Sequence, residues 1–477
     1  MTYYSYGMLQ PEVHDVVPPT APQSWRGPGR CDVAIVGGGA SGTLTAIHLM
    51  ASRAHDLTVT VHDAGGELGK GLAYGTSDPR HLLNVRSRHM SAFPDIPSDL
   101  VEWARRTGRQ PDAQAFLPRR DYAVYLRETL DRLRDDRFAF RAERVVALEP
   151  VAGGFELHAS GGRVTRAATV VLAPGNLRPA PLAVDGAALP TARWHLPDPW
   201  DLDRLTALPP HAVVVLVGSG LTAVDTAITL LGDAPERRVV MVSRHGLLPA
   251  AHIEQSSTAW LSPIPAGPVT ADQLAALLRA QIAAARQQGV DWRPVVDGLR
   301  APTQDLWQRL SLDERRRFLA SYARAWEVRR HRMATEVAAR LDGYREEGRL
   351  HVLADGLAAV TDHGPRCEVE LPALPDPLFA DAVVNCTGPM TDVSRSTDPL
   401  LRSLVRRGLL APDPLRLGVA CTPEGDVLDV SGQVIPGLHV VGPPRKGVLY
   451  ETTGIPEIRA QAAALAHRLP QRLRTPA

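Results

Sequence analysis

Two short apolar strands, each followed by a glycine-rich turn and a helix, constrain the fold of this chain more than any other feature. The turns lie at residues 37–42 and 218–223. In such a unit one glycine permits the tight turn and a second lets the backbone approach a pyrophosphate, while the helix N-terminus offers unpaired N–H groups to the phosphate. Wholly apolar strands are typical of parallel sheets that are covered on both faces. The duplication predicts an α/β chain with two dinucleotide-binding, Rossmann-like domains.

The first turn carries all three glycines of this pattern, Gly37, Gly39 and Gly42, with Ser41 at the predicted start of the helix. The next predicted strand ends at Asp63, where a carboxylate is placed to bind the hydroxyls of a ribose. These five residues predict a dinucleotide site. The alternative is an ordinary glycine-rich turn between a strand and a helix.

The second turn contains Gly218, Gly220 and Ala223, and its next strand ends in Ser243 and Arg244 instead of a carboxylate. A hydroxyl and a guanidinium suit the 2′-phosphate of NADP, which a carboxylate would repel. We therefore expect this site to bind NADPH in preference to NADH. The alternative is that Arg244 is a solvated surface arginine.

Two such sites in one chain indicate a flavoprotein in which hydride passes from a nicotinamide to a flavin. We assign FAD to the first turn and NADPH to the second. A dehydrogenase with a single cofactor would not need both.

The second unit is bracketed by two further apolar strands, which end near Gly175 and Gly388. Both glycines are predicted cofactor contacts. This arrangement predicts that an NADP domain, residues 206–360, is inserted into a FAD domain that is split into residues 31–205 and 361–477. Residues 1–30 are expected to form a flexible tail without the apolar segment of a secretory signal.

Helical periodicity dominates the second half of the predicted NADP domain, at about residues 270–345. Leu274, Leu277, Leu278 and Ile282 recur on one face of the first predicted helix. Such a face usually packs into the protein interior. We expect a helical insertion whose apolar positions belong to the core.

Near the C-terminus, an apolar strand runs into Gly442, and a helix follows from about residue 456. The N-terminus of that helix would stabilise negative charge on a reduced flavin. The predicted contacts are Gly442, Thr452, Thr453, Gly454 and Ile455. Thr453 and Asn84 are the candidates nearest the flavin ring.

The composition narrows the classes of function. A net charge of +1 gives no sign of a nucleic-acid or membrane surface, and no apolar run reaches the length of a membrane span. The four cysteines, Cys31, Cys367, Cys386 and Cys421, have neither metal-ligand nor CxxC spacing. Buried, reduced thiols, a cytoplasmic location and no bound metal are expected.

Several stretches carry a resemblance to a known family. The chain resembles the FAD/NAD(P)-binding flavoproteins that include the bacterial FAD-dependent urate hydroxylase, and more distantly the N-hydroxylating flavin monooxygenases. The matching stretches are GLAYGT at 71–76, HLLNV at 81–85, MSAFP at 90–94, SRHGLLP at 243–249, Trp326 with RHR at 330–332, NCTGP at 385–389 and GP at 442–443 through IPEIR at 455–459.

The resemblance implies an NADPH-dependent FAD monooxygenase. In such enzymes O₂ adds to the reduced flavin at C4a, and the resulting (hydro)peroxide passes oxygen to the substrate. The implied substrate is a small, polar, anionic metabolite that contains nitrogen, either an amino acid oxidised at nitrogen or a purine hydroxylated as urate is. The oligomeric state is not indicated.

Basic residues are the candidates for binding that anion. They are Arg330, His331 and Arg332, together with Arg86 and Arg88, which lie where this chain departs from the family pattern by being basic. The alternatives are a solvated helix face, contacts to NADP phosphates, or local salt bridges.

Two other functions stay open from the sequence. One is an oxidoreductase that passes electrons to a small molecule or protein without oxygen insertion, although the chain lacks a redox-active CxxC. The other is a nucleotide sensor or scaffold without catalysis. The intact glycines at both turns disfavour the second.

Overall fold

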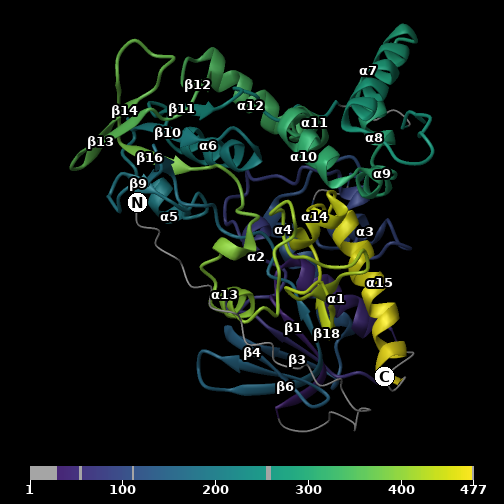
Figure 1. Ribbon diagram of the computed structural model, residues 1–477. Helices are drawn as coiled ribbons and strands as arrows, with labels where there is room; N and C mark the ends of the chain where they lie inside the picture. The colour runs from purple at the N-terminus through teal and green to yellow at the C-terminus, as the bar shows by residue number, and fades with distance from the viewer. Residues whose placement is uncertain (1–28, 53–55, 110–111, 254–258, 475–477) are drawn as a thin grey trace, which may run out of the picture.

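The computed structural model describes residues 29–52, 56–109, 112–253 and 259–474. The expected flexible tail, residues 1–30, lies outside this range except for its last two residues. The chain forms two lobes, each built on a parallel sheet, and a group of helices that extends from the second lobe (Figure 1).

The first lobe is built on a sheet with the strand order β17-β18-β6-β1-β2-β3. Its strands are β1 (Arg30–Val36), β2 (Val59–His62), β3 (Phe138–Arg141), β6 (Val164–Leu172), β17 (Asp426–Leu428) and β18 (Val434–Val440). β1 lies in the middle, where Val33, Ala34 and Ile35 are fully buried, and it runs parallel to β2 and β6. The first glycine turn therefore leaves the carboxyl edge of the sheet between two parallel neighbours, where ligands bind in such folds.

Helices and a hairpin cover the two faces of this sheet. The helices α1 (Ala40–Ala51), α4 (Arg119–Leu133) and α15 (Ile455–Arg474) share one apolar core with β1 and β2. A second core joins β6 and β18 to β4 (Val145–Val151), β5 (Gly154–Ala159) and α13 (Pro399–Arg406). The last helix of the chain thus packs directly on the helix of the first glycine turn (Figure 1).

The second lobe repeats the plan with the strand order β12-β11-β10-β16-β9, all parallel. Its strands are β9 (His195–Leu196), β10 (Val213–Val217), β11 (Arg238–Ser243), β12 (Leu350–Ala354) and β16 (Ala382–Asn385). The helices α5 (Leu202–Thr206), α6 (Leu221–Asp233) and α12 (Thr335–Glu346) pack on one face. A small antiparallel sheet, β13 (Ala359–His363), β14 (Arg366–Glu370) and β15 (Leu378–Ala380), covers the other.

The expected domain boundary at residue 360 is wrong. The strand at 382–385 was assigned to the second part of the FAD domain, but it pairs with β10, and Val384 lies opposite Leu216. Val384 and Leu216 are both fully buried in the core of the second lobe, which explains the pairing. β9 also belongs to this sheet, so the second lobe begins before the expected residue 206.

The helical insertion is present as five short helices before α12. They are α7 (Ala271–Gln287), α8 (Arg293–Gly298), α9 (Thr303–Arg309), α10 (Leu312–Ser321) and α11 (Ala323–Arg330). Thr270 caps α7, since its hydroxyl accepts from the Gln273 N–H at 3.2 Å and the Gln273 side chain accepts from the Thr270 N–H at 2.8 Å. α7 stands at the outer edge of the molecule (Figure 1).

The core assignment of the α7 face is only partly correct. Leu274 packs against a small cluster around Trp307 and Tyr450. Leu277, Leu278 and Ile282 are only half-buried and belong to none of the hydrophobic clusters in the described part of the chain.

A buried polar network joins the two lobes through His81. Its Nε2 donates to the Asp225 carbonyl at 2.9 Å, and its Nδ1 lies 2.8 Å from the Thr76 hydroxyl. The Thr229 hydroxyl donates to Asp78 at 2.7 Å. Thr76, Asp78 and His81 come from the first lobe, whereas Asp225 and Thr229 lie on α6, so the network fixes one lobe against the other.

All four cysteines are buried and unpaired, as expected. Burial raises the pKa of Cys31, Cys367 and Cys386 to about 12 and that of Cys421 to about 11. No helix within the described residues is long and apolar enough to cross a membrane.

Candidate functional site

The first glycine turn closes between the ends of β2 and β6. The Gly37 N–H donates to the His62 carbonyl at 2.8 Å, and the Ala173 N–H donates to the Val36 carbonyl at 2.8 Å. Gly37 has φ = +110°, and a Cβ atom there would lie 2.2 Å from the Ala173 carbonyl oxygen. Only glycine fits this position without a shift of the backbone.

Gly42 and Gly39 both lie close to neighbouring backbone. A Cβ atom at Gly42 would lie 1.8 Å from the Gly37 carbonyl oxygen, where α1 meets β1. One at Gly39 would lie 3.3 Å from the Gly71 Cα, across the cavity entrance. The turn therefore exposes bare backbone at the N-terminus of α1, as a pyrophosphate requires.

Asp63 stands beside this turn and is held by the backbone. One carboxylate oxygen accepts from the Gly38 N–H at 2.8 Å, and the other accepts from the Gly65 N–H at 2.9 Å. Asp63 lines a cavity of about 380 Å³ together with Gly39, Ser41 and other residues of the turn. A carboxylate oriented in this way retains acceptor capacity for ribose hydroxyls.

Residues that the sequence did not single out complete this cavity. Lys70, Gly71 and Tyr74 line it from the short helix α2 (Gly71–Tyr74) and the residue before it. Lys70 forms a short ion pair with Glu67 and is half-exposed. Gly71 lies within GLAYGT, one of the stretches that carry the family resemblance, so the sequence did mark this segment. Its contact with Gly39 depends on the fold.

The second glycine turn has the same backbone construction. The Gly218 N–H donates to the Val242 carbonyl at 2.7 Å, and the Cys386 N–H donates to the Val217 carbonyl at 2.9 Å. Gly218 has φ = +123°, and a Cβ atom there would lie 2.1 Å from the Cys386 carbonyl oxygen. Ala223 takes the third position and is buried at the start of α6.

The side chains around the second turn are hydroxyls and guanidinium groups. Ser219 Oγ lies 2.7 Å from Ser243 Oγ. Arg324, from α11 of the helical insertion, donates to Ser219 Oγ at 3.0 Å. Burial and the nearby charge of Arg244 lower the pKa of Arg324, so two guanidinium groups approach the end of β11. Sequence reasoning missed Arg324, because no spacing links it to the turn.

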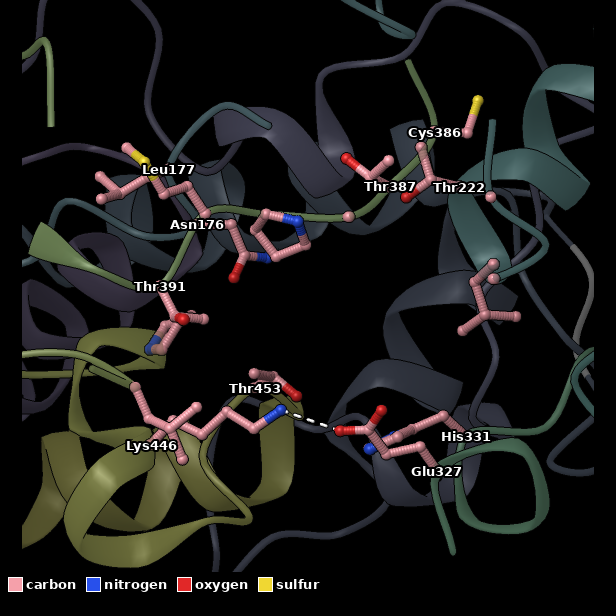
Figure 2. A pocket seen from close by; sticks show the side chains of 18 of the residues that line it. Asn176, Leu177, Thr222, Glu327, His331, Cys386, Thr387, Thr391, Lys446 and Thr453 are labelled. Atoms are coloured by element: carbon pink, nitrogen blue, oxygen red, sulfur yellow. Dashed lines mark hydrogen bonds and ion pairs between the residues drawn. The ribbon is translucent and has the colours of Figure 1, made fainter. Parts of the chain in front are cut away.

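The two cavities meet between the lobes. The second turn opens into a cleft of about 630 Å³ that Gly218, Gly220, Ser243, Arg244 and Gly388 help to line. Thr222, Thr387 and Thr453 line the same cleft (Figure 2). Five residues line both this cleft and the cavity of the first turn: Pro174, Gly175, Asn176, Pro443 and Thr453. The predicted contacts Gly175 and Thr453 thus lie where two bound dinucleotides would approach each other.

The C-terminal segment is fixed against the first turn by hydrogen bonds. The Thr452 hydroxyl donates to the Gly442 carbonyl at 2.9 Å, and Gln461 accepts from the Gly442 N–H at 2.9 Å. A Cβ atom at Gly442, where φ is +89°, would lie 2.4 Å from Ser41 Oγ. Thr453 is exposed to the cavities, and the N-terminus of α15 begins just after Gly454, at Ile455.

An ion pair crosses one end of the cleft, between α11 and α14 (Lys446–Leu449). Lys446 Nζ lies 2.9 Å from Glu327 Oε1 (Figure 2). Burial acts to raise the pKa of Glu327, but the charge and hydrogen bond of Lys446 outweigh it, so the pKa lies below its usual range. His331 lines the same cleft, and burial lowers its pKa.

The structure surrounds Arg86 with protein acceptors. Its guanidinium donates to the carbonyls of Gln114, at 2.6 Å, and Ile253, and it lies 4.9 Å from the Phe116 ring centre. Arg88 donates to His89 at 2.9 Å. Neither arginine lines the two cavities described above. A substrate role for Arg86 and Arg88 stays a prediction, and their positions outside both cavities do not support it.

Arg330 and Arg332 lie in a buried cluster of opposite charges beside α15. Arg330 contacts Glu451 at 3.2 Å and Glu457 at 3.9 Å, and Arg332 pairs with Asp297. Arg300, which the sequence did not single out, also binds Glu457, through two hydrogen bonds of 2.7 and 2.9 Å.

Not every donor in this cluster is satisfied. Arg332 is 4% exposed, and its Nε and Nη1 have no hydrogen-bond partner within the described residues. The pKa of His252 falls to about 4 because of burial and the charge of Arg332. His252 Nε2 also lies 3.0 Å from the Asn84 carbonyl. Asn84, a predicted neighbour of the flavin, therefore lies near this cluster of opposite charges.

Comparisons with known proteins agree with this geometry. Residues 34–177 match a family described as FAD-NAD(P)-binding. No curated protein sequence matches the chain.

Three solved structures show how far the likeness of fold extends. Ornithine N-hydroxylase from Kutzneria sp. 744, in complex with reduced FAD, NADP⁺ and L-ornithine, is 15% identical with a TM-score of 0.64, covering 93% of this chain and 99% of its own. Ornithine hydroxylase from Pseudomonas aeruginosa is 18% identical, with the same TM-score and coverage. The FAD-bound cadaverine monooxygenase of Erwinia amylovora is 12% identical with a TM-score of 0.63, covering 94% and 96%.

These likenesses confirm the predicted fold with two dinucleotide-binding domains. They also confirm, at the level of fold, the resemblance to N-hydroxylating flavin monooxygenases. The cofactor prediction of FAD and NADP agrees with the matched family and with the cofactors of the Kutzneria complex.

Proposed function

We propose that this protein is an NADPH-dependent FAD monooxygenase that inserts oxygen into a small, polar, anionic metabolite containing nitrogen. The observation that carries the proposal is the meeting of two glycine-turn cavities at Pro174, Gly175, Asn176, Pro443 and Thr453. Two cofactors bound at the turns would bring their redox-active rings to this junction, which hydride transfer requires.

FAD is proposed at the first turn, where it supplies the redox and oxygen chemistry. The bare backbone at Gly37, Gly39 and Gly42 receives the pyrophosphate, and Asp63 receives the ribose. The N-terminus of α15 stabilises negative charge on the flavin. NADPH is proposed at the second turn, where Ser243, Arg244 and Arg324 surround the 2′-phosphate.

The substrate is proposed to bind near the cluster that contains Arg330 and Arg332. Arg332 has two buried N–H groups without partners among the described residues, and a buried donor of this kind favours an acceptor from a ligand. The carboxylates in the cluster, such as Glu457, would hold the guanidinium groups in place. An anionic substrate would then accept hydrogen bonds from the N–H groups that these carboxylates do not reach. An amino-acid carboxylate meets this requirement, and so does urate.

The test measures product. Purified protein with NADPH and O₂ is incubated with amino acids, diamines and urate, and products are identified by mass spectrometry. A product heavier by one oxygen atom, labelled from ¹⁸O₂, is expected with an anionic substrate. NADPH oxidation without any oxygenated product, together with turnover of an artificial acceptor in the absence of O₂, would favour the oxidoreductase without oxygen insertion.

The proposed location is the cytoplasm, on the strength of the four unpaired thiols.

A further inference from the structure

The helical insertion carries an open, apolar hollow that shares no lining residue with the two cofactor cavities. Its volume is about 280 Å³, and it lies between α7 on one side and α9, α10 and α11 on the other. Figure 1 shows α7 at the outer edge of the molecule. The hollow is therefore separate from the proposed site of oxygen transfer.

Opposite faces of α11 serve the two regions. Arg324, Glu327 and Val328 line the NADPH cleft, whereas Trp326 and Arg329 line the hollow. This division follows from helical spacing, since positions three or four residues apart share a face. One helix thus presents a polar wall to the cofactor and a largely apolar wall to the hollow.

The helices α8 and α10 contact α7, but part of its apolar face stays uncovered. Leu277, Leu278 and Ile282 point into the hollow and are only half-buried. Within α7 the buried residues are Ala271 and Ala285. A contiguous, partly exposed apolar surface of this kind usually marks a site that binds a ligand or another protein.

The floor of the hollow is built from stacked aromatic rings. Tyr450 lies 4.7 Å from Trp307, between ring centres, and Phe318 meets Tyr450 edge-on at 5.3 Å. Tyr450 has φ = +56° and forms a tight turn in which the Glu451 N–H donates to the Leu449 carbonyl at 2.7 Å. This backbone conformation is strained for a bulky residue, and such strain is concentrated at functional sites.

The charged side chains that line the hollow are both arginines. Arg279 and Arg329 are exposed, and the described lining contains no acidic residue. Asp272 lies beside Arg279 and Tyr322, but Arg317 pairs with its carboxylate through two hydrogen bonds of 3.0 and 2.6 Å. Arg279 lies 6.0 Å from the Tyr322 ring centre. The electrostatic preference of the opening is therefore for an anion, whereas the interior favours hydrocarbon or an aromatic ring.

We propose that this hollow binds one small amphipathic anion, with a hydrocarbon or aryl body against Leu278, Phe318 and Tyr450 and a carboxylate at Arg279 and Arg329. The volume is close to the roughly 300 Å³ at which ligand pockets begin, so it suits a medium-chain or aryl acid. The Tyr450 hydroxyl donates to Glu327 Oε1 at 3.4 Å, so the hollow adjoins the cleft of the second turn without sharing a lining residue with it.

The test uses the full-length holoprotein and two probes that differ only in the head group. Decanoate and decylammonium are titrated by isothermal calorimetry below their micelle concentrations. Decanoate is expected to saturate one site, and decylammonium to bind about tenfold more weakly or not at all, because the arginines favour the carboxylate.

Variants locate the binding to the hollow. Leu278→Asp should weaken decanoate binding by about tenfold or more, since it puts a like charge on the apolar wall. The matched control is Leu312→Asp, on an exposed part of α10 outside the lining. Ala275→Phe, which fills the hollow without adding charge, should also block binding. Flavin absorbance and thermal unfolding verify that each variant is folded.

The head group is tested separately. The double substitution Arg279→Gln with Arg329→Gln should remove the preference for decanoate over decylammonium, whereas Arg316→Gln, on an exposed pair with Asp313, should keep it. Equal binding of both probes to the unmodified protein, or uptake without saturation, overturns the proposal. So does a dimer, seen by sedimentation, that Leu278→Asp converts to monomer, because a second copy would then be the occupant.

Discussion

The two glycine turns are nearly identical in backbone and different in the side chains that surround them. Gly37 and Gly218 each have a positive φ, each donates to the end of the next strand, and each lies against a carbonyl of a parallel neighbour, Ala173 or Cys386. Beside the first turn stands the carboxylate of Asp63, held by two backbone N–H groups.

Beside the second turn stand Ser219, Ser243, Arg244 and Arg324. The backbone therefore accounts for dinucleotide binding in general, whereas the polar groups at the end of the adjacent strand select the cofactor. A carboxylate favours a free ribose, and guanidinium groups favour a ribose phosphate. On the proposed assignment, the same fold would hold two different cofactors because a few side chains differ.

The largest effect is expected when the first glycine of each turn is replaced, because the two replacements should affect different cofactors. Gly37→Ala should yield protein without bound FAD, because the new Cβ atom meets the Ala173 carbonyl at 2.2 Å in a left-handed conformation. Gly218→Ala has the equivalent clash with Cys386, at 2.1 Å, and should leave FAD bound while NADPH no longer reduces it. Flavin absorbance after purification and the rate of anaerobic reduction measure both outcomes.

One result would contradict this prediction. If Gly218→Ala loses its flavin and Gly37→Ala keeps it, the assignment of cofactors to turns is reversed. If both variants are unfolded by circular dichroism, Gly38→Ala serves in place of Gly37→Ala, because the added Cβ would lie 2.8 Å from the side chain of Asp63.

The carboxylate of the first turn should have the next largest effect. Asp63→Ala removes the acceptor of the Gly38 N–H and the proposed ribose partner, which should weaken FAD binding by about 1–3 kcal/mol, or roughly 5- to 150-fold. Titration of apoprotein with FAD measures the change. Asp355→Asn is the control, since Asp355 also accepts backbone N–H groups but lines the other cleft. Unchanged FAD affinity in Asp63→Ala would exclude a ribose role.

The guanidinium groups of the second turn should control cofactor choice. Arg244→Gln with Arg324→Gln should raise the KM for NADPH roughly tenfold or more and leave that for NADH nearly unchanged. Steady-state NAD(P)H oxidation gives both values. Arg329→Gln, on the opposite face of α11, is the control. Equal losses with both nucleotides would mean that the arginines act on something other than the 2′-phosphate.

The smallest effect concerns the contact between the two lobes. Burial lowers the pKa of His81, which bonds to α6 in its neutral form. The unfolded chain then takes up this proton first as the pH falls below about 6.5, so the folded state loses stability between that pH and the lower folded pKa.

His81→Gln should reduce this acid sensitivity by at most about 1.4 kcal/mol per pH unit. Denaturant unfolding between pH 5 and 7 measures it, with the exposed His351→Gln as control. An unchanged pH slope in His81→Gln would contradict the inference that His81 stays neutral in the fold.

Local patterns in the sequence were sufficient for the turns but not for their surroundings. Gly37, Gly42 and Asp63 belong to one strand–turn–helix–strand unit with a recognisable sequence pattern, so the chain alone predicted them. The strand at 382–385 was assigned to the wrong lobe because one buried apolar strand resembles another, and its partner is selected by packing against β10.

The helical insertion was predicted from its periodicity, yet its contacts depend on the fold. Arg324 reaches Ser219 across 105 positions of sequence, and nothing local marks it. The apolar face of α7 has the same pattern as a core helix, and only the structure shows that Leu277 and Leu278 face an open hollow.

Anaerobic stopped-flow reduction of the bound flavin tests the central claim most directly, that FAD at the first turn receives hydride from NADPH at the second. The prediction is that NADPH bleaches the flavin much faster than NADH does, and that Arg244→Gln with Arg324→Gln removes this difference without loss of FAD. Protein that purifies without flavin, or flavin that NADPH does not reduce, would contradict the account.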